Sequence, residues 1–503
     1  MSKLTHLVVM VCTVLLTMLS PLSRAQDTGL GDGLKPDVRL LIDISSSMEI
    51  ADPENLRVPA VELIVRLLPE GSKAGVWIFG DSVEVLVPHG IVDDEWRETA
   101  QLAVARIDSS GQLTNIPDAL DAALYDIERL DPGYRRSIIL LTDGRVEISE
   151  SPMTNAMAAR TLLADNAPQV GALGIPIHTI ALSEEADWSF VQSLARITNG
   201  IAEKVDTAER LTDVFYQSLE MVAPTSSVPV SRKKFFIDAT VREFTALAFF
   251  NDSSPVFGLV GPDGRAYNSN ELVEGVEWFE NGEFSLVTVT EPQPGRWELV
   301  APESEKNRVS VIADLVLEVD PLPYSLPAGE YAELGIRLRE HGKVITDPKL
   351  LSVFTLTVEI TSPGGKKHTV DVFSNYTKPA DGDFNVQIPG LERPGRYRVT
   401  AQLAGESLRR ELRMYVDVTS SATSSAISTR SKAPAAEDFE APMVGFGAAL
   451  LLILAVVGAL LRRRKRRKLE VWRRRNLEMN DGKFTTGTLN LAVSLPAADA
   501  DDK

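Results

Sequence analysis

Cysteine is almost absent from this chain of 503 residues, and the single example is Cys12. It lies in an N-terminal stretch that we expect to be removed, so the mature chain would contain no thiol. Disulfide bridges, cysteine-ligated zinc and a cysteine nucleophile are thereby excluded. Because large extracellular eukaryotic proteins commonly carry disulfides, we interpret the chain as a bacterial envelope protein.

Histidine is also scarce, and its spacing shows none of the pairs that zinc sites use. The sequence contains neither a phosphate-binding P-loop nor a GxSxG nucleophile motif. We therefore do not expect an enzyme. A hydrolase whose paired carboxylates come together only in the folded β-rich part is the alternative. The five histidines are His6, His89, His178, His341 and His368.

Positive charge is in deficit over most of the chain. Lys and Arg number 52 against 70 Asp and Glu, a net charge of -18. The last 42 residues have a net charge of +6 and the first 25 have +2, which leaves -26 for residues 26–461. A region that acidic repels nucleic acid, so we expect no DNA or RNA partner.

Two apolar runs predict the topology. The run Leu7–Leu19 follows Lys3 and precedes Ser23-Arg24-Ala25, the pattern of a signal peptide over residues 1–25. An uncleaved anchor is the alternative, although the run is short for a bilayer. The uncharged run Met443–Leu461 predicts a transmembrane helix over residues 442–461.

The residues around that second run indicate its orientation. A block of seven basic residues, Arg462–Lys468, follows it at once and marks the cytoplasmic side. We therefore expect a single-pass type I cell-membrane protein, with N-terminal domains in the periplasm or outside the cell and a basic cytoplasmic tail over 462–503. The block could instead recognise anionic lipid. The Ser/Thr/Ala-rich residues 419–441 predict a flexible linker.

Between these runs the pattern changes once. Over residues 36–222, apolar runs such as Val38–Ile44 and Ser137–Thr142 alternate with helical segments such as Trp188–Ile197. This order predicts an α/β domain with a doubly wound, mainly parallel sheet.

Residues 228–418 contain short alternating runs separated by Gly and Pro, which predict two β-sandwich modules of immunoglobulin-like type over 228–314 and 315–418. An internal repeat supports two modules. Pro262 precedes Pro294-Gly295 by 32 residues, and Pro363 precedes Pro394-Gly395 by 31. Chance matching of turns is the alternative. Trp297 and Tyr397, at matching positions, are expected to be core residues.

Polar oxygens follow the predicted strand ends of the α/β domain. Asp43, Ser45 and Ser47 alternate after the first strand, Thr114 precedes a helix, and Asp143 follows the apolar strand Ser137–Thr142. Ligands of open α/β sheets bind at the carboxyl ends of the strands. Carboxylate and hydroxyl oxygens suit a hard divalent cation. The sequence therefore predicts a metal site at this edge.

This pattern resembles a von Willebrand factor A domain with its metal-ion-dependent adhesion site. The resemblance covers about residues 36–222 and rests on Asp43-x-Ser45-x-Ser47, Thr114 and Asp143 in the family's order. It implies a Rossmann-like fold and a bound Mg²⁺, with Mn²⁺ or Ca²⁺ as alternatives. It implies that Asp143 binds through water or holds the other ligands in place. The Thr114 loop reads Gly-Gln-Leu-Thr, where the family often has a tighter turn.

The resemblance also implies a function. We expect a membrane-anchored, metal-dependent adhesion module whose ion accepts an acidic residue of a protein partner. An intact but idle metal site is one alternative. Another is a metal-independent scaffold or assembly subunit of an envelope complex.

Overall fold

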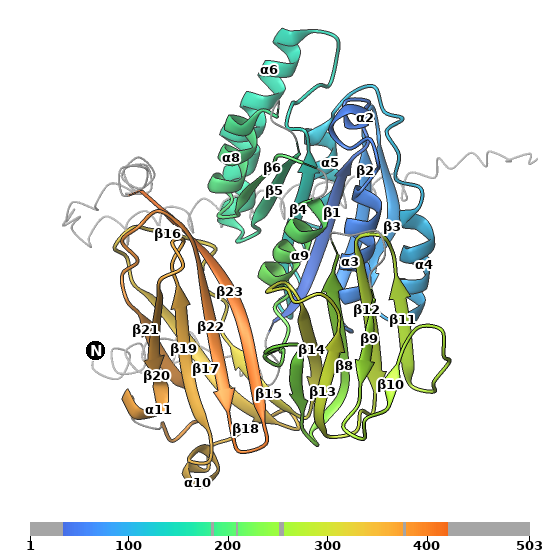
Figure 1. Ribbon diagram of the computed structural model, residues 1–503. Coiled ribbons are helices and arrows are strands. Elements are labelled where there is room, and N and C mark those ends of the chain that lie inside the picture. Colours follow the sequence, from blue (N-terminus) through green and yellow to red (C-terminus); the bar gives the residue numbers. More distant parts are fainter. Residues whose placement is uncertain (1–33, 183–185, 208–209, 251–255, 376–378, 421–503) are drawn as a thin grey trace, which may run out of the picture. The chain divides into compact units, whose positions relative to one another are not determined.

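The computed structural model describes residues 34–182, 186–207, 210–250, 256–375 and 379–420 (Figure 1). The chain divides into two compact units, Met1–Ile427 and Ser428–Lys503, and all described residues belong to the first. The expected signal peptide, membrane helix, tail and nearly all of the linker lie outside the described residues. Within the described ranges, no helix combines the length and apolarity needed to cross a bilayer.

The N-terminal region contains a six-stranded sheet in the order β3-β2-β1-β4-β5-β6. Every neighbouring pair is parallel except β2 and β3, which run antiparallel at the edge. The predicted mainly parallel sheet is therefore confirmed. The strands are β1 (Lys35–Asp43), β2 (Lys73–Phe79), β3 (Val83–Ile91), β4 (Tyr134–Thr142), β5 (Ile177–Leu182) and β6 (Ala202–Val205).

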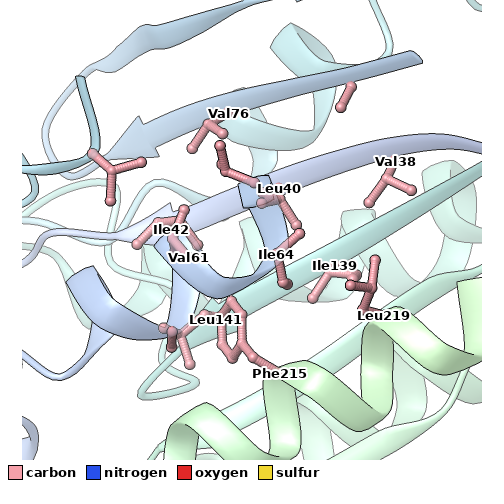
Figure 2. Packing of buried hydrophobic residues seen from close by; sticks show 14 of the residues in the cluster. Val38, Leu40, Ile42, Val61, Ile64, Val76, Ile139, Leu141, Phe215 and Leu219 are labelled. Atoms are coloured by element: carbon pink, nitrogen blue, oxygen red, sulfur yellow. The ribbon is translucent and has the colours of Figure 1, made fainter. Parts of the chain in front are cut away.

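Helices cover both faces of this sheet because its central strands are apolar on both sides. Val38, Leu40 and Ile42 of β1 belong to one buried cluster with side chains of α3 and α9 (Figure 2). Leu41 belongs to a second cluster with α5 and α8. The helices are α2 (Met48–Ala51), α3 (Arg57–Leu67), α4 (Asp94–Val104), α5 (Ile116–Ala123), α6 (Pro152–Thr161), the π-helical η1 (Leu162–Asn166), α7 (Ala167–Ala172), α8 (Trp188–Ile197) and α9 (Leu211–Val222).

In the described part of the next region, the regular elements are all strands. Two four-stranded sheets, β10-β9-β13-β7 and β11-β12-β8-β14, contribute to one buried cluster that includes Phe244 and Trp297. The strands are β7 (Lys234–Ile237), β8 (Val241–Phe249), β9 (Gly258–Val260), β10 (Ala266–Tyr267), β11 (Val276–Glu280), β12 (Phe284–Thr290), β13 (Gly295–Val300) and β14 (Arg308–Ala313).

The last described region again has two sheets around one buried cluster. One sheet joins β15, β17 and β18, with β21 paired to β17, and the other has the order β16-β23-β22-β19-β20. The elements are β15 (Leu315–Val319), β16 (Ser325–Pro327), β17 (Ala332–Glu340), β18 (Lys343–Val344), α10 (Pro348–Leu351), β19 (Thr355–Thr361), β20 (Lys367–Asp371), α11 (Val372–Asn375), β21 (Phe384–Ile388), β22 (Gly395–Ala404) and β23 (Arg409–Thr419).

The two strand-rich regions repeat one local arrangement. Gly295 begins β13 at φ +143°, and a Cβ placed there would lie 2.7 Å from Pro262. Gly395 begins β22 at φ +125°, and a Cβ there would lie 2.9 Å from Pro363. In both copies glycine permits a left-handed backbone and a close proline. The spacing found in the sequence therefore corresponds to one packing contact made twice.

A short segment joins the two strand-rich regions. The Ser227 N–H donates to the Glu411 carbonyl, and the Glu411 N–H donates back to Ser227. The Val228 N–H donates to Val309 of β14. The segment therefore pairs with β14 on one side and with β23 on the other, so the two regions share one continuous hydrogen-bonded sheet. The sequence analysis did not predict this pairing.

Candidate metal centre

Asp43 is the last residue of β1, and its side chain is fully buried. Its carboxylate accepts hydrogen bonds from the Ser45 N–H (2.8 Å) and from the Thr142 hydroxyl (2.6 Å). Burial and the negative charge of Asp143 raise the pKa of Asp43 to about 6, against the lowering effect of these hydrogen bonds. The protein thus holds an acidic group where its ionised form lacks sufficient compensation.

Ser45 and Ser47 follow in the loop between β1 and α2. Their hydroxyl oxygens lie 3.0 Å apart, so the two side chains point to one place. Ser47 is the N-cap residue of α2 but makes no side-chain hydrogen bond to the helix, and its hydroxyl contacts that of Ser45 instead. The next residue, Met48, is fully buried in the core and anchors the loop to the sheet.

Thr114 reaches the same edge from a different loop. The Gly111 N–H donates to the Ile44 carbonyl, and Gly111 forms a bridge with Ser45. Thr114 exchanges backbone hydrogen bonds with Glu147, which lies beyond the end of β4. The loop 111–114 is therefore held between the loop after β1 and the loop after β4, and the Thr114 side chain is buried there.

Asp143 follows β4 directly and is half-buried. Its negative charge contributes to the raised pKa of Asp43. Thr142, the residue before it, connects the Asp43 carboxylate to the loop after β4: its hydroxyl donates to Asp43 and accepts the Gly144 N–H at 3.0 Å. Sequence reasoning missed Thr142, although it ends the same apolar strand that led to Asp143.

A buried ion pair lies behind the β1 loop and was also missed. The Arg57 guanidinium binds the Asp52 carboxylate at 2.8 Å, and both side chains are fully buried. The same guanidinium donates to the Asp43 carbonyl at 2.6 Å and to the Ser109 hydroxyl at 2.8 Å. No motif marks these residues, because their roles depend on contacts made only in the folded chain.

The donor set fits a hard divalent cation. Asp43 and Asp143 supply carboxylates, whereas Ser45, Ser47 and Thr114 supply hydroxyls. In the ranges that the structure describes, no three His, Cys, Asp or Glu side chains gather as a group that could hold a metal. A site at this edge would therefore depend on its hydroxyl groups and on water, as Mg²⁺ sites commonly do.

Residues 36–204 match the family model for the von Willebrand factor type A domain, about a third of the chain. This region is therefore a von Willebrand factor type A domain, and the expected fold is confirmed at that level. A search of curated proteins finds no match.

Solved structures give three comparisons. A von Willebrand factor type A protein from Catenulispora acidiphila is 16% identical, with 62% of this chain and 64% of that chain covered and a TM-score of 0.31. Proximal thread matrix protein 1 from the mussel byssus, solved with a zinc-occupied adhesion-site motif, is 18% identical, with 39% and 50% covered and a TM-score of 0.31. The pilus adhesin SpaC from Lactobacillus rhamnosus GG is 12% identical, with 75% and 54% covered and a TM-score of 0.32. The matches span less than two thirds of those chains.

Proposed function

We propose that this chain is a membrane-anchored, metal-dependent protein-binding module of a bacterial envelope. The von Willebrand factor type A domain would carry Mg²⁺, or Mn²⁺ or Ca²⁺, at the carboxyl edge of its sheet. The two strand-rich regions would be sandwich modules between this domain and the membrane. In this proposal the chain is not an enzyme, and an acidic side chain of a protein partner completes the metal coordination.

One observation carries the proposal. Asp43 is fully buried, and the negative charge of the Asp143 carboxylate adds to the cost of ionising it. A buried and a half-buried carboxylate at one edge of the sheet, with three hydroxyls on the adjoining loops, favour a bound cation.

Each residue of the site would have a role that follows from its chemistry. Asp43, Ser45, Ser47 and Thr114 would contact the ion directly or through water. Asp143 would bind through water or orient the ligands, and Thr142 would hold the Asp43 carboxylate in place. The bound ion would supply an electrophilic position that an outside carboxylate can occupy.

The test is a capture experiment with the full-length chain and an envelope extract. The wild type is used with Mg²⁺ and with EDTA. Asp43→Asn is used with Mg²⁺, and Asp131→Asn is the matched control. Asp131 is an exposed carboxylate beside the start of β4, at the opposite edge of the sheet. We expect a partner with Mg²⁺ only, captured by the wild type and by the control.

Equal capture in every arm would contradict the metal bridge. It would support the alternative, a metal-independent scaffold or assembly subunit. Captured proteins are identified by mass spectrometry, and each is then titrated against the purified chain with and without Mg²⁺. Direct binding that needs both Mg²⁺ and Asp43 completes the test.

A further inference from the structure

Arg57 begins α3 and connects three segments of the α/β domain. Its guanidinium binds the Asp52 carboxylate, the Asp43 carbonyl and the Ser109 hydroxyl, each within 2.6–2.8 Å. Asp43 starts the loop that leads to Ser45 and Ser47. Ser109 lies at the start of the loop that leads through Gly111 to Thr114. One buried side chain therefore spans both loops that carry the candidate ligands.

The positive charge of Arg57 is paired with Asp52 and not with the Asp43 carboxylate. Asp52 accepts from the Arg57 Nε, and also from the N–H groups of Leu56 and Arg57 at 2.7 and 3.0 Å. Asp52 thus compensates the guanidinium and also holds the start of α3. Arg57 meets Asp43 only at its carbonyl, so the Asp43 carboxylate keeps its own charge for another partner.

Stability alone is a weak reason for this arrangement. A buried ion pair costs much of its Coulomb energy in desolvation, and apolar residues of similar volume often replace it without loss. The planar guanidinium, however, holds its N–H donors in fixed directions, and the ammonium group of a lysine cannot reproduce these distances and angles. What the geometry specifies is the position of one loop relative to the other.

We propose that Arg57 is a positioning residue that holds the Asp43–Ser47 loop and the Ser109–Thr114 loop in register before a metal ion binds. The inference rests on the proposed function in one respect, namely that these loops bind metal. Its structural part, the connection of the two loops, stands on the contacts alone and can be tested without metal.

The first experiment measures amide hydrogen exchange of the full-length chain in EDTA. In Arg57→Lys we expect exchange at the Ser45 and Gly111 amides, which bond within this edge, to rise about tenfold or more, because the bridge is lost. Arg97→Lys is the matched control. Arg97 is less buried than Arg57, and its guanidinium donates to carbonyls at the end of α3, those of Val65, Arg66 and Leu68. Exchange at the two amides that is unchanged in Arg57→Lys would overturn the inference.

The second experiment measures Mg²⁺ affinity by calorimetry. Groups that orient metal ligands typically contribute about 10- to 100-fold to affinity, so Arg57→Lys should bind at least about tenfold more weakly and Arg97→Lys should bind as the wild type does. Ser109→Ala removes only one arm of the bridge from a part-buried side chain. It should show a smaller loss in the same direction, so the test survives if Arg57→Lys does not fold.

The outcomes separate the two proposals. A wild type that binds no Mg²⁺ overturns the proposed function, while the exchange data still decide whether Arg57 joins the loops. A wild type that binds Mg²⁺, with Arg57→Lys and Ser109→Ala binding equally well, overturns this inference alone.

Discussion

At the residue scale, the main feature of the candidate metal centre is the buried negative charge of Asp43. Burial and Asp143 raise the pKa of Asp43 to about 6. In a carboxyl group, a raised pKa in the folded state means that the ionised form disfavours folding above the pKa of the unfolded chain. Without metal, Asp43 should therefore reduce stability at neutral pH.

The change Asp43→Asn tests this cost. The asparagine keeps the size of the side chain but removes the charge. One pKa unit corresponds to about 1.4 kcal/mol, so the unfolding free energy in EDTA at pH 7.5 should rise by about 1–3 kcal/mol. Urea unfolding of both forms measures it. A clear fall in the unfolding free energy of Asp43→Asn in EDTA would show that the protein itself compensates the charge of the Asp43 carboxylate.

His178 predicts a dependence of stability on pH. This residue of β5 is fully buried, accepts the Ile201 N–H at 3.3 Å, and meets the Tyr324 ring edge-on at 4.5 Å. Burial, together with the smaller effect of the positive charges of Arg135 and Arg396, lowers the pKa of His178 to about 3. The unfolded chain binds this proton near pH 6.5, whereas the folded chain stays neutral until about pH 3.

The contribution of neutral His178 to the unfolding free energy is therefore fully present above pH 6.5. It is lost as the pH falls toward 3, by about 1.4 kcal/mol per pH unit. His178→Gln should lose about 2 kcal/mol less than the wild type between pH 6.5 and pH 5. His341→Gln, at an exposed side chain, should behave as the wild type does. Denaturant unfolding at the two pH values measures the difference, and equal losses in wild type and His178→Gln would contradict the account.

At the element scale, the site depends on how closely two loops approach. A Cβ at Gly111 would lie 2.9 Å from the Gly80 Cα and 3.1 Å from the Ile44 carbonyl oxygen. Gly80 and Ile44 follow the neighbouring strands β2 and β1. Only glycine at position 111 lets the loop that carries Thr114 pack against both strand ends.

The change Gly111→Ala should push this loop outward. We expect the chain to stay folded and Mg²⁺ affinity to fall about tenfold, because Thr114 moves away from the other donors. Gly282→Ala is the matched control, since nothing lies within 4 Å of a Cβ there. Calorimetry compares the variants. An unchanged affinity in Gly111→Ala would exclude the loop from the metal site.

Elements were predictable where burial leaves a pattern. α8 matches the expected Trp188–Ile197, because it buries one face, and β5 (Ile177–Leu182) is buried over its whole length. α6 has no buried residue and thus no apolar stripe, so periodicity does not reveal this helix in the sequence.

The apolar spacing of residues 117–130 predicts a helix over this whole range, but α5 ends at Ala123. The Ala123 carbonyl accepts the Arg39 guanidinium, and the Ile127 N–H donates to Leu124 instead. That competitor lies 84 residues away in the sequence, so local periodicity could not reveal it.

The residues of the candidate site were also predictable only in part from the sequence. Asp43, Ser45, Ser47, Thr114 and Asp143 follow strand ends or precede a helix, so sequence order indicates a common edge. Thr142, Asp52 and Arg57 support that edge through contacts between different segments of the fold. No fixed residue spacing marks such contacts in the sequence.

At the scale of the whole molecule, buried polar contacts join the regions of the first unit. The Arg410 guanidinium of β23 is fully buried and lies 2.6 Å from the Asp238 carboxylate beside β7. Glu220 at the end of α9 binds Arg308 of β14 at 3.3 Å and the Tyr415 hydroxyl of β23 at 2.9 Å. The von Willebrand domain and both strand-rich regions therefore meet through specific partners.

The change Asp238→Asn should leave the Arg410 charge buried without its carboxylate. Breaking such a pair costs about 3–5 kcal/mol, so the unfolding free energy should fall by about that amount. Asp314→Asn makes the same chemical change at a more exposed pair with Arg242 and should cost under about 1 kcal/mol. Denaturant unfolding compares the two. Equal effects would show that the buried pair does not stabilise the joint.

The most direct test of the account is a calorimetric titration of Mg²⁺ into the EDTA-treated full-length chain. The wild type and Asp131→Asn should each bind one Mg²⁺ per chain with similar affinity, and Asp43→Asn should give no binding heat. A wild type that binds no Mg²⁺, or an Asp43→Asn variant that binds as tightly as the wild type, would contradict the assignment of a metal centre to this edge of the sheet.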